Sequence, residues 1–200
     1  MSKAVTKNRK SKREIRREQM ERKKRLRALQ IWVPITVIVL ALAALLIFRA
    51  TRPEVEGVTT VDAAIANQHD DTLDIPFGSI PPLGGPHAAI WQNCGIYDTP
   101  VSGQFAIHSM EHGAVWITYN PDLPADQIAS LQDMVRGEGS MILNPYPNQT
   151  SPIVMTVWDR QLELDSADDA RVAEFISRYK GNRGPEAGAR CSGGVGTPIG

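Results

Sequence analysis

An uninterrupted apolar run, Ile31–Phe48, constrains the fold of this chain more than any other feature. It holds no charged side chain, and at the helical rise of about 1.5 Å per residue it covers roughly 27 Å, close to the hydrocarbon thickness of a bilayer. Pro34 falls in the first turn of the run, where a missing backbone N–H costs least. Trp32 suits one membrane interface, and Arg49 and Arg52 suit the other. The run is therefore predicted to be a transmembrane helix.

Charge is divided sharply between the two sides of this run. Residues 1–30 carry 13 Lys/Arg and three Glu, whereas residues 53–200 carry seven Lys/Arg and 19 Asp/Glu, so the net charge of +0 conceals two opposed segments. Because Lys/Arg-rich flanks stay on the cytoplasmic side, this bias predicts a cytoplasmic N-terminus and a C-terminal part outside. The basic tail is expected to contact anionic lipids of the bilayer rather than nucleic acid. A cleaved signal peptide is disfavoured, because its basic region would be much shorter.

We therefore expect a single-pass protein of the cell membrane with four parts. These are a basic cytoplasmic tail over 1–30, a transmembrane helix over 31–48, a tether over 49–75 and an extracytoplasmic domain over 76–200. The tether is polar and acidic, with a short helix expected around Val61–Gln68. His69 lies in its acidic part and is expected to be solvated. The outer domain is large enough to form a core of its own.

Strand and helix patterns in the outer domain follow the order β-α-β-β-α. Ala114–Tyr119 is rich in β-branched and aromatic residues and predicts a buried strand, and the patterns of Ser140–Asn144 and Ile153–Leu164 predict two more. Helical spacing over Ala125–Arg136 and over 166–180 predicts two helices. This order is typical of an α+β fold, with a mainly antiparallel sheet and two helices on one face.

Cys94 and Cys191 are the only cysteines of the chain. An even pair on the oxidising side of a membrane favours a disulfide, which would close a loop of about 100 residues and pin the Gly-rich C-terminal tail. A metal-ligand role for Cys94 and a reactive thiol are the alternatives. A thioredoxin-like activity is disfavoured, because the chain has no Cys-x-x-Cys motif.

Chemically capable residues gather between Gly85 and Tyr119. Three of the four histidines, His87, His108 and His112, lie in this segment beside glycines, prolines and two tryptophans. Residues 108–112 read His-Ser-Met-Glu-His and match the inverted zinc-protease pattern H-x-x-E-H. That chemistry needs a helix, in which two histidines bind zinc and the Glu polarises a water. Because a glycine and a predicted strand follow at once, peptidase activity is disfavoured.

The backbone conformation of this motif decides which ligands can meet. In a helix, His108 and His112 lie about 6 Å apart and can share one ion, with His87 as a third ligand. Glu111 is then a further ligand or the carboxylate that orients a ring. In a strand, either histidine instead neighbours Met110, and a set of nitrogen and sulfur favours copper, particularly Cu(I). A buried hydrogen-bond network without any metal is the remaining alternative.

Three motifs occur in a fixed order along the outer domain. They are Gly85-Pro86-His87, Trp91-x-x-Cys94-Gly95-x-Tyr97-Asp98-x-Pro100-Val101 and His108-Ser109-x-Glu111-His112-Gly113. Together they resemble the bacterial domain-of-unknown-function family DUF3105, over about residues 75–192. The resemblance implies a membrane-anchored extracytoplasmic protein and carries no assigned reaction. Met110 stands where most relatives are expected to have Leu, which weakens a copper site based on that sulfur.

We favour an extracytoplasmic binding domain that takes copper or zinc through His87, His108, Glu111 and His112. The first alternative is a non-catalytic assembly subunit that docks onto a membrane-protein partner. It predicts an exposed aromatic patch and a closed hydrogen-bond network around the histidines. The second alternative, a metal-dependent hydrolase, requires a helix at the motif and Glu111 facing a cleft. Binding is favoured over catalysis, and whether the protein is an enzyme stays open.

Overall fold

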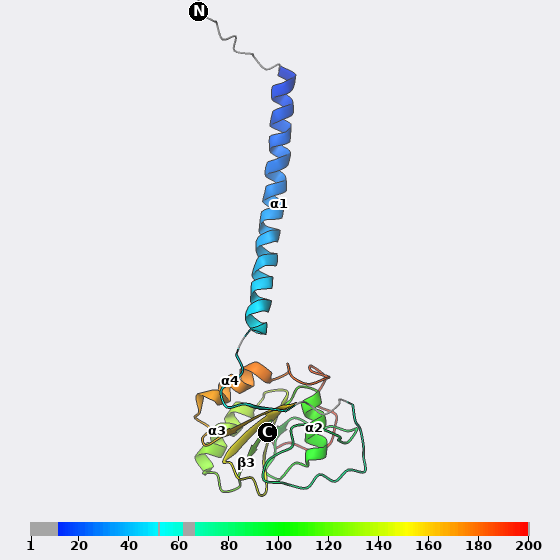
Figure 1. The fold of residues 1–200 in the computed structure, drawn as a ribbon, viewed down its shortest axis with the longest axis vertical. Coiled ribbons are helices and arrows are strands. Elements are labelled where there is room, and N and C mark those ends of the chain that lie inside the picture. Colours follow the sequence, from blue (N-terminus) through cyan, green and yellow to red (C-terminus); the bar gives the residue numbers. More distant parts are fainter. Residues whose placement is uncertain (1–11, 52, 62–66, 200) are drawn as a thin grey trace, which may run out of the picture. The chain divides into compact units, whose positions relative to one another are not determined.

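The computed structural model describes residues 12–51, 53–61 and 67–199. The chain divides into two compact units, Met1–Pro53 and Glu54–Gly200, and each is described by itself. Within its described residues the first unit consists of helix α1 (Lys12–Ala50), which Figure 1 draws in blue to cyan.

Helix α1 is long and apolar enough to cross a membrane, in agreement with the sequence prediction. Its apolar side chains are exposed on all sides, including Ile31 and Trp32, and no protein surface covers them within the described residues. The helix begins at Lys12 rather than at the apolar run, because Arg, Lys, Glu and Leu in the basic segment are strong helix formers. Pro34 consequently lies inside the helix, and its predicted place in a first turn is wrong.

The second unit is built on one six-stranded sheet. Its strands are β1 (Thr59–Thr60), β2 (Gly95–Ile96), β3 (Val115–Tyr119), β4 (Met141–Pro145), β5 (Ile153–Val157) and β6 (Arg160–Leu164). Their order across the sheet is β1-β6-β5-β3-β4-β2. The pairings of β6 with β1 and β5, and of β5 with β3, are antiparallel, whereas β4 runs parallel to both β2 and β3. The α+β class is confirmed, with a mixed sheet.

Two helices cover one face of the sheet, as predicted. Helix α3 (Ala125–Val135) connects β3 to its parallel neighbour β4, and α4 (Ala170–Tyr179) follows β6. Both helices bury apolar side chains, such as Leu131 and Phe175, against the sheet side chains of Ile117 and their neighbours. This face holds the larger core of the domain.

A third helix, α2 (Gly103–Glu111), covers the opposite face. It contacts Trp116 and Ile142, whose side chains alternate with those that face α3 and α4. Figure 1 shows α2 in green on the side of the sheet away from α3. The backbone at the histidine motif is therefore helical, which selects the helix alternative over the strand.

From Glu54 onward, the segment predicted as a tether belongs to the second compact unit. Val55 is buried in the core, and Thr59–Thr60 pairs with β6 as an edge strand. Composition concealed this because the segment has few large apolar side chains, although Val58 and Ile75 also pack against the cores of the domain. The short helix expected around Val61–Gln68 falls mostly outside the described residues.

The long β-pattern Ile153–Leu164 is the hairpin β5–β6 rather than one strand. The chain turns at Trp158 and Asp159, and Asp159 takes a φ of 61°. Its carboxylate is held by Arg160 at 2.9 Å and by the Nε of Arg183 at 2.8 Å. The run contains no Gly or Pro, and Asp159 is its single turn-favouring residue, so the signal of a turn in the sequence is weak.

Candidate functional site

Helix α2 places two histidines on one of its faces. Ala106, Ile107 and Met110 form the opposite, fully buried face that packs on the sheet. His108 and His112 are four residues apart, so they project from the same side of the helix. Their ring centroids lie 4.8 Å apart.

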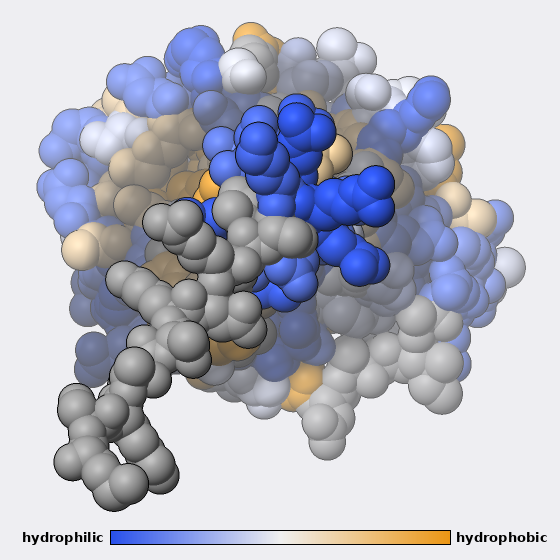
Figure 2. All heavy atoms as spheres, turned by 90° about the horizontal axis from the view of Figure 1, so that it is seen from above, coloured by the Kyte–Doolittle hydropathy of each residue, from blue (hydrophilic) through white to orange (hydrophobic). Residues whose placement is uncertain are grey.

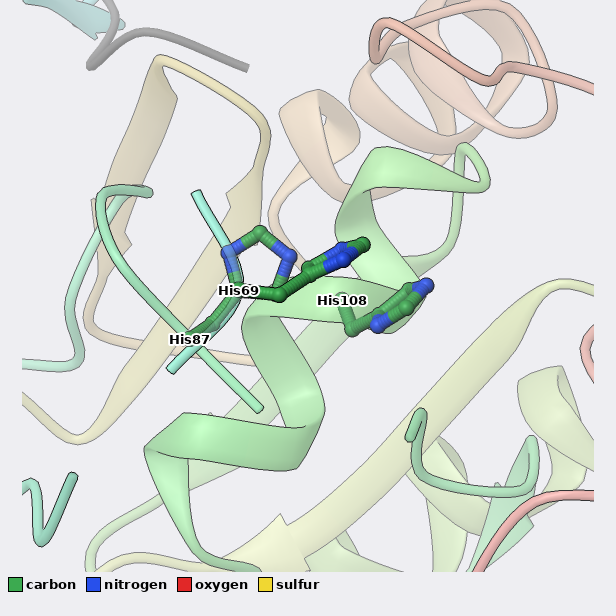
Figure 3. Close-up of side chains that lie close together, drawn as sticks. All are labelled: His69, His87 and His108. Atoms are coloured by element: carbon green, nitrogen blue, oxygen red, sulfur yellow. The ribbon is translucent and has the colours of Figure 1, made fainter. Parts of the chain in front are cut away.

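A parallel β-bridge brings His69 and His87 to the same place. The backbone N–H of Asp70 donates to the carbonyl of His87 at 2.7 Å, and the N–H of His87 donates to the carbonyl of Gln68 at 3.0 Å. The rings of His69 and His87 then lie 4.9 Å and 5.1 Å from the ring of His108, centroid to centroid (Figure 3). All four histidines of the chain therefore form one cluster.

Backbone carbonyls fix the orientation of the three buried rings. The Nδ1 atoms of His87, His108 and His112 lie 2.7, 2.9 and 2.7 Å from the carbonyl oxygens of Gly85, Ala88 and Arg190, respectively. A carbonyl only accepts, so each Nδ1 carries the proton, and the neutral ring keeps its lone pair on Nε2. This is the hydrogen-bond pattern that orients metal-ligating histidines.

Glu111 adds a fully buried carboxylate to the cluster. Its Oε1 accepts from the backbone N–H of Asn67 at 3.0 Å. Its Oε2 lies 3.3 Å from Nε2 of His87 and 3.9 Å from Nε2 of His69. Within the described residues, neither this Oε2 nor Nε2 of His87 has a hydrogen-bond partner. Two buried acceptors that face each other are unfavourable unless a proton or a metal cation lies between them.

Burial lowers the pKa of His108 below its ordinary value, and the rings of His112, His87 and His69 lower it further. The hydrogen bond to the carbonyl of Ala88 raises this pKa. Its effect is smaller than that of burial and larger than that of any one of these rings. The ring of His108 thus favours its neutral form, which is the form that binds a metal ion.

The C-terminal segment, residues 180–199, lies against the C-terminal end of α2. The backbone N–H of Glu186 donates to the carbonyl of Glu111 at 2.9 Å, and that of Gly188 to the carbonyl of His112 at 3.0 Å. These bonds satisfy carbonyls that a helix C-terminus leaves without partners. The Glu186 carboxylate also lies 3.5 Å from Nε2 of His112. The segment therefore carries a side chain into the cluster.

Cys94 and Cys191 hold this segment in place. They lie at disulfide distance, with Cα atoms 5.4 Å apart, and the structure joins them as predicted. The backbone N–H of Cys94 also donates to the carbonyl of Cys191 at 2.8 Å. Arg190, whose carbonyl orients His112, directly precedes Cys191 in the chain.

At Gly184 the backbone of the C-terminal segment lies so close to the backbone of α2 that no side chain fits between them. A Cβ there would lie 2.4 Å from the carbonyl oxygen of Glu111 and 2.5 Å from that of Met110, at a φ of +123°. We expect Gly184→Ala to lower the free energy of unfolding by about 1–3 kcal/mol or more, because backbone atoms must move apart. Chemical denaturation measures the loss.

Gly188→Ala is the matched control for this substitution. Its φ is +93°, equally unsuited to alanine, but a Cβ there meets nothing within 4 Å. The control isolates backbone strain, so Gly184→Ala should be the more destabilising of the two. Equal losses would contradict the close packing of this segment on α2.

The structure brings the predicted ligands His87, His108, Glu111 and His112 together, and their binding of a metal stays a prediction. The three histidines among them, with His69 and Glu186, make two overlapping sets whose donor atoms lie within 4.8 Å of one another: His69, His87 and His108, and His108, His112 and Glu186. Glu111 belongs to neither set. His69 is 36% exposed, in line with the expectation that it is solvated, but its place in the first set was not predicted, because its acidic neighbours resemble a surface segment. Glu186, in a Gly/Pro-rich loop, gives no signal in the sequence.

Two other sequence hypotheses meet the structure differently. The hydrolase interpretation requires a helix at the motif, which is present, but also Glu111 facing a cleft, whereas Glu111 is fully buried and turned towards His87. The nitrogen and sulfur site with Met110 required a strand, and Met110 is instead fully buried against the sheet.

Comparison with known proteins agrees with the motifs. Neither the curated proteins nor the solved structures gave a match. The family model described as "Protein of unknown function (DUF3105)" matches residues 69–193, a span that begins at His69 and includes all five residues of the two donor sets. Because this match covers more than half of the chain, the protein belongs to the DUF3105 family.

Proposed function

We propose that the second unit binds one transition-metal ion, copper or zinc, through Nε2 of His69, His87 and His108. Imidazole nitrogen suits both ions, and three such ligands leave a fourth position for water or an exchanging group. The ordered Nδ1 contacts of His87 and His108 support this role, because they aim two neutral nitrogens before any ion arrives.

One observation carries the proposal. Nε2 of His87 and Oε2 of Glu111 are buried, lack hydrogen-bond partners among the described residues and lie 3.3 Å apart. A proton on His87 would compensate these two atoms alone. A metal ion on His87 would compensate them and also use the nitrogens of His69 and His108, which lie within 4.8 Å of it and of each other. The carboxylate of Glu111 then supplies negative charge beside a cation.

His69 is the adjustable ligand of this set. Its ring is stacked on that of His108 at an interplanar angle of 12°. The in-plane lone pairs of the two rings therefore lie in nearly parallel planes and do not point at one common position. Its side chain is 36% exposed, whereas those of His87 and Glu111 are fully buried. Binding of an ion therefore turns the His69 ring about its side-chain bonds and leaves the buried rings in place.

We also propose that this unit lies outside the cytoplasm. The excess of Lys/Arg before the apolar run favours a cytoplasmic N-terminus, and a cysteine pair at disulfide distance suits an oxidising compartment. The basic segment then lies against anionic lipids on the cytoplasmic side.

The test is a metal-retention measurement on the full chain in detergent, purified without a polyhistidine tag because a tag adds imidazoles. After incubation with Cu(II) or Zn(II) and gel filtration, mass spectrometry of the metal should find about one ion per chain. Asp122→Asn, which removes an exposed carboxylate beyond the far end of β3, should bind equally well. Failure to retain either metal at micromolar concentration in folded protein would remove the proposal.

The assembly-subunit alternative lacks the surface that it predicts. After Pro53, the exposed large hydrophobic side chains of the described residues are aliphatic: Val61, Ile80, Ile90 and Ile199. In Figure 2 most of the visible residues are hydrophilic, and hydrophobic residues appear between them. The histidine network is also open at Nε2 of His87. Cross-linking in native membranes that recovers one constant partner would restore this alternative.

A further inference from the structure

The histidine cluster contains a second set of possible donors around His108. His108, His112 and Glu186 also place one donor atom each within 4.8 Å of the others. His112 is oriented like the other buried rings, with Nδ1 held by the carbonyl of Arg190 and Nε2 3.5 Å from the Glu186 carboxylate. His108 belongs to both sets.

His108 can serve only one set at a time. Its Nδ1 is held by the carbonyl of Ala88 at 2.9 Å, so Nε2 is the nitrogen left for a metal. One imidazole lone pair binds one ion. The two sets therefore exclude each other, although their members lie side by side, with the rings of His69 and His112 4.9 Å and 4.8 Å from the ring of His108.

Each set has one member at the surface. The side chain of His69 is 36% exposed and that of Glu186 is 43% exposed, whereas His87, His108 and His112 are buried. An ion in either set can thus gain or lose its outer ligand without disturbing the buried rings. This differs from a closed structural site, in which all ligands are buried and fixed.

We propose that the cluster is a hand-over site, in which one ion shifts between a three-histidine set and a two-histidine, one-carboxylate set by ligand exchange about His108. The proposal rests on metal binding by the domain. The first set offers neutral nitrogens and the second adds a carboxylate, so the two differ in charge and in the ions they prefer. A site of this kind suits a protein that receives a metal ion on one side of the cluster and releases it on the other.

The proposal predicts redundancy between His69 and Glu186. We expect the full chain to bind one ion, and His69→Ala and Glu186→Gln each to retain one ion with less than tenfold weaker binding. The double variant should lose at least 100-fold, because it breaks both sets. Competition with a chromophoric chelator, on protein without a polyhistidine tag, measures the affinities for Cu(II) and Zn(II).

His108→Ala should match the double variant, since His108 serves both sets. His108 is buried, so this variant also needs a folding check, whereas the double variant changes two exposed residues and keeps the test decisive. Two ions per wild-type chain would overturn the shared ligand. A double variant no weaker than His69→Ala would overturn the second set while leaving metal binding intact. A wild-type chain without metal would instead remove the proposed function itself.

Discussion

Replacing both cysteines by serine, Cys94→Ser/Cys191→Ser, is expected to lower the free energy of unfolding by about 2–5 kcal/mol. The cysteines are 97 residues apart in sequence, and chain entropy alone assigns a loop of this length about 4–5 kcal/mol. For a domain of this size, each kcal/mol corresponds to roughly 2–4 °C in the melting temperature. Denaturant titration of the full chain measures the change.

The same variant should weaken metal binding. The disulfide holds the segment that carries Glu186 and the carbonyl of Arg190, which orients His112.

A reducing agent is the internal control for the stability measurement, because it should lower the stability of the wild-type protein and leave that of the serine variant unchanged. A serine variant with the wild-type denaturation midpoint would show that the cysteine pair contributes no stability.

The second large effect concerns orientation in the membrane. Residues 1–30 carry 13 Lys/Arg, and the flank after the apolar run carries Arg49 and Arg52. Exchanging all 13 Lys/Arg of residues 1–30 for Gln, together with two Lys added after Arg52, should invert the chain, because the Lys/Arg bias sets orientation. Protease added to bacterial spheroplasts should digest the second unit of the wild-type protein and spare that of the variant.

Thiol alkylation gives an independent readout of the same change. In the wild-type protein the two cysteines should resist alkylation, since they are joined by a disulfide outside the cytoplasm. In the inverted variant both should react, because the cytoplasm keeps thiols reduced. Exchanging Arg for Lys and Lys for Arg at the same positions keeps the charge, so this matched control should leave the orientation unaltered. Protection of the wild-type domain from external protease would contradict the proposed location.

Sequence patterns predicted the parts of this fold whose residues signal locally. The apolar run Ile31–Phe48 and the strand Ala114–Tyr119 are signalled by composition and the helix Ala125–Arg136 by periodicity, and all three appear nearly as predicted. Helix α2 stayed open between helix and strand because its nine residues have no side-chain cap, and it depends on contacts with the sheet. Strand β1 has only two residues and depends wholly on its partner β6.

The candidate site shows the same division. His108, Glu111 and His112 belong to one short motif, so their proximity follows from the chain once it is helical. His87 is 21 residues earlier and was associated with them through composition alone. His69 reaches the cluster through a β-bridge, and Glu186 reaches it through the C-terminal segment. Both are long-range contacts, which local sequence patterns do not predict.

The most direct test of this account is anomalous diffraction from crystals of the protein loaded with zinc. The account predicts one anomalous peak for zinc, at a distance of about 2.0–2.1 Å from Nε2 of His108. The remaining ligands should be His69 and His87, or His112 and Glu186. A zinc peak elsewhere in the domain, with the Nε2 of His108 uncoordinated, would contradict it.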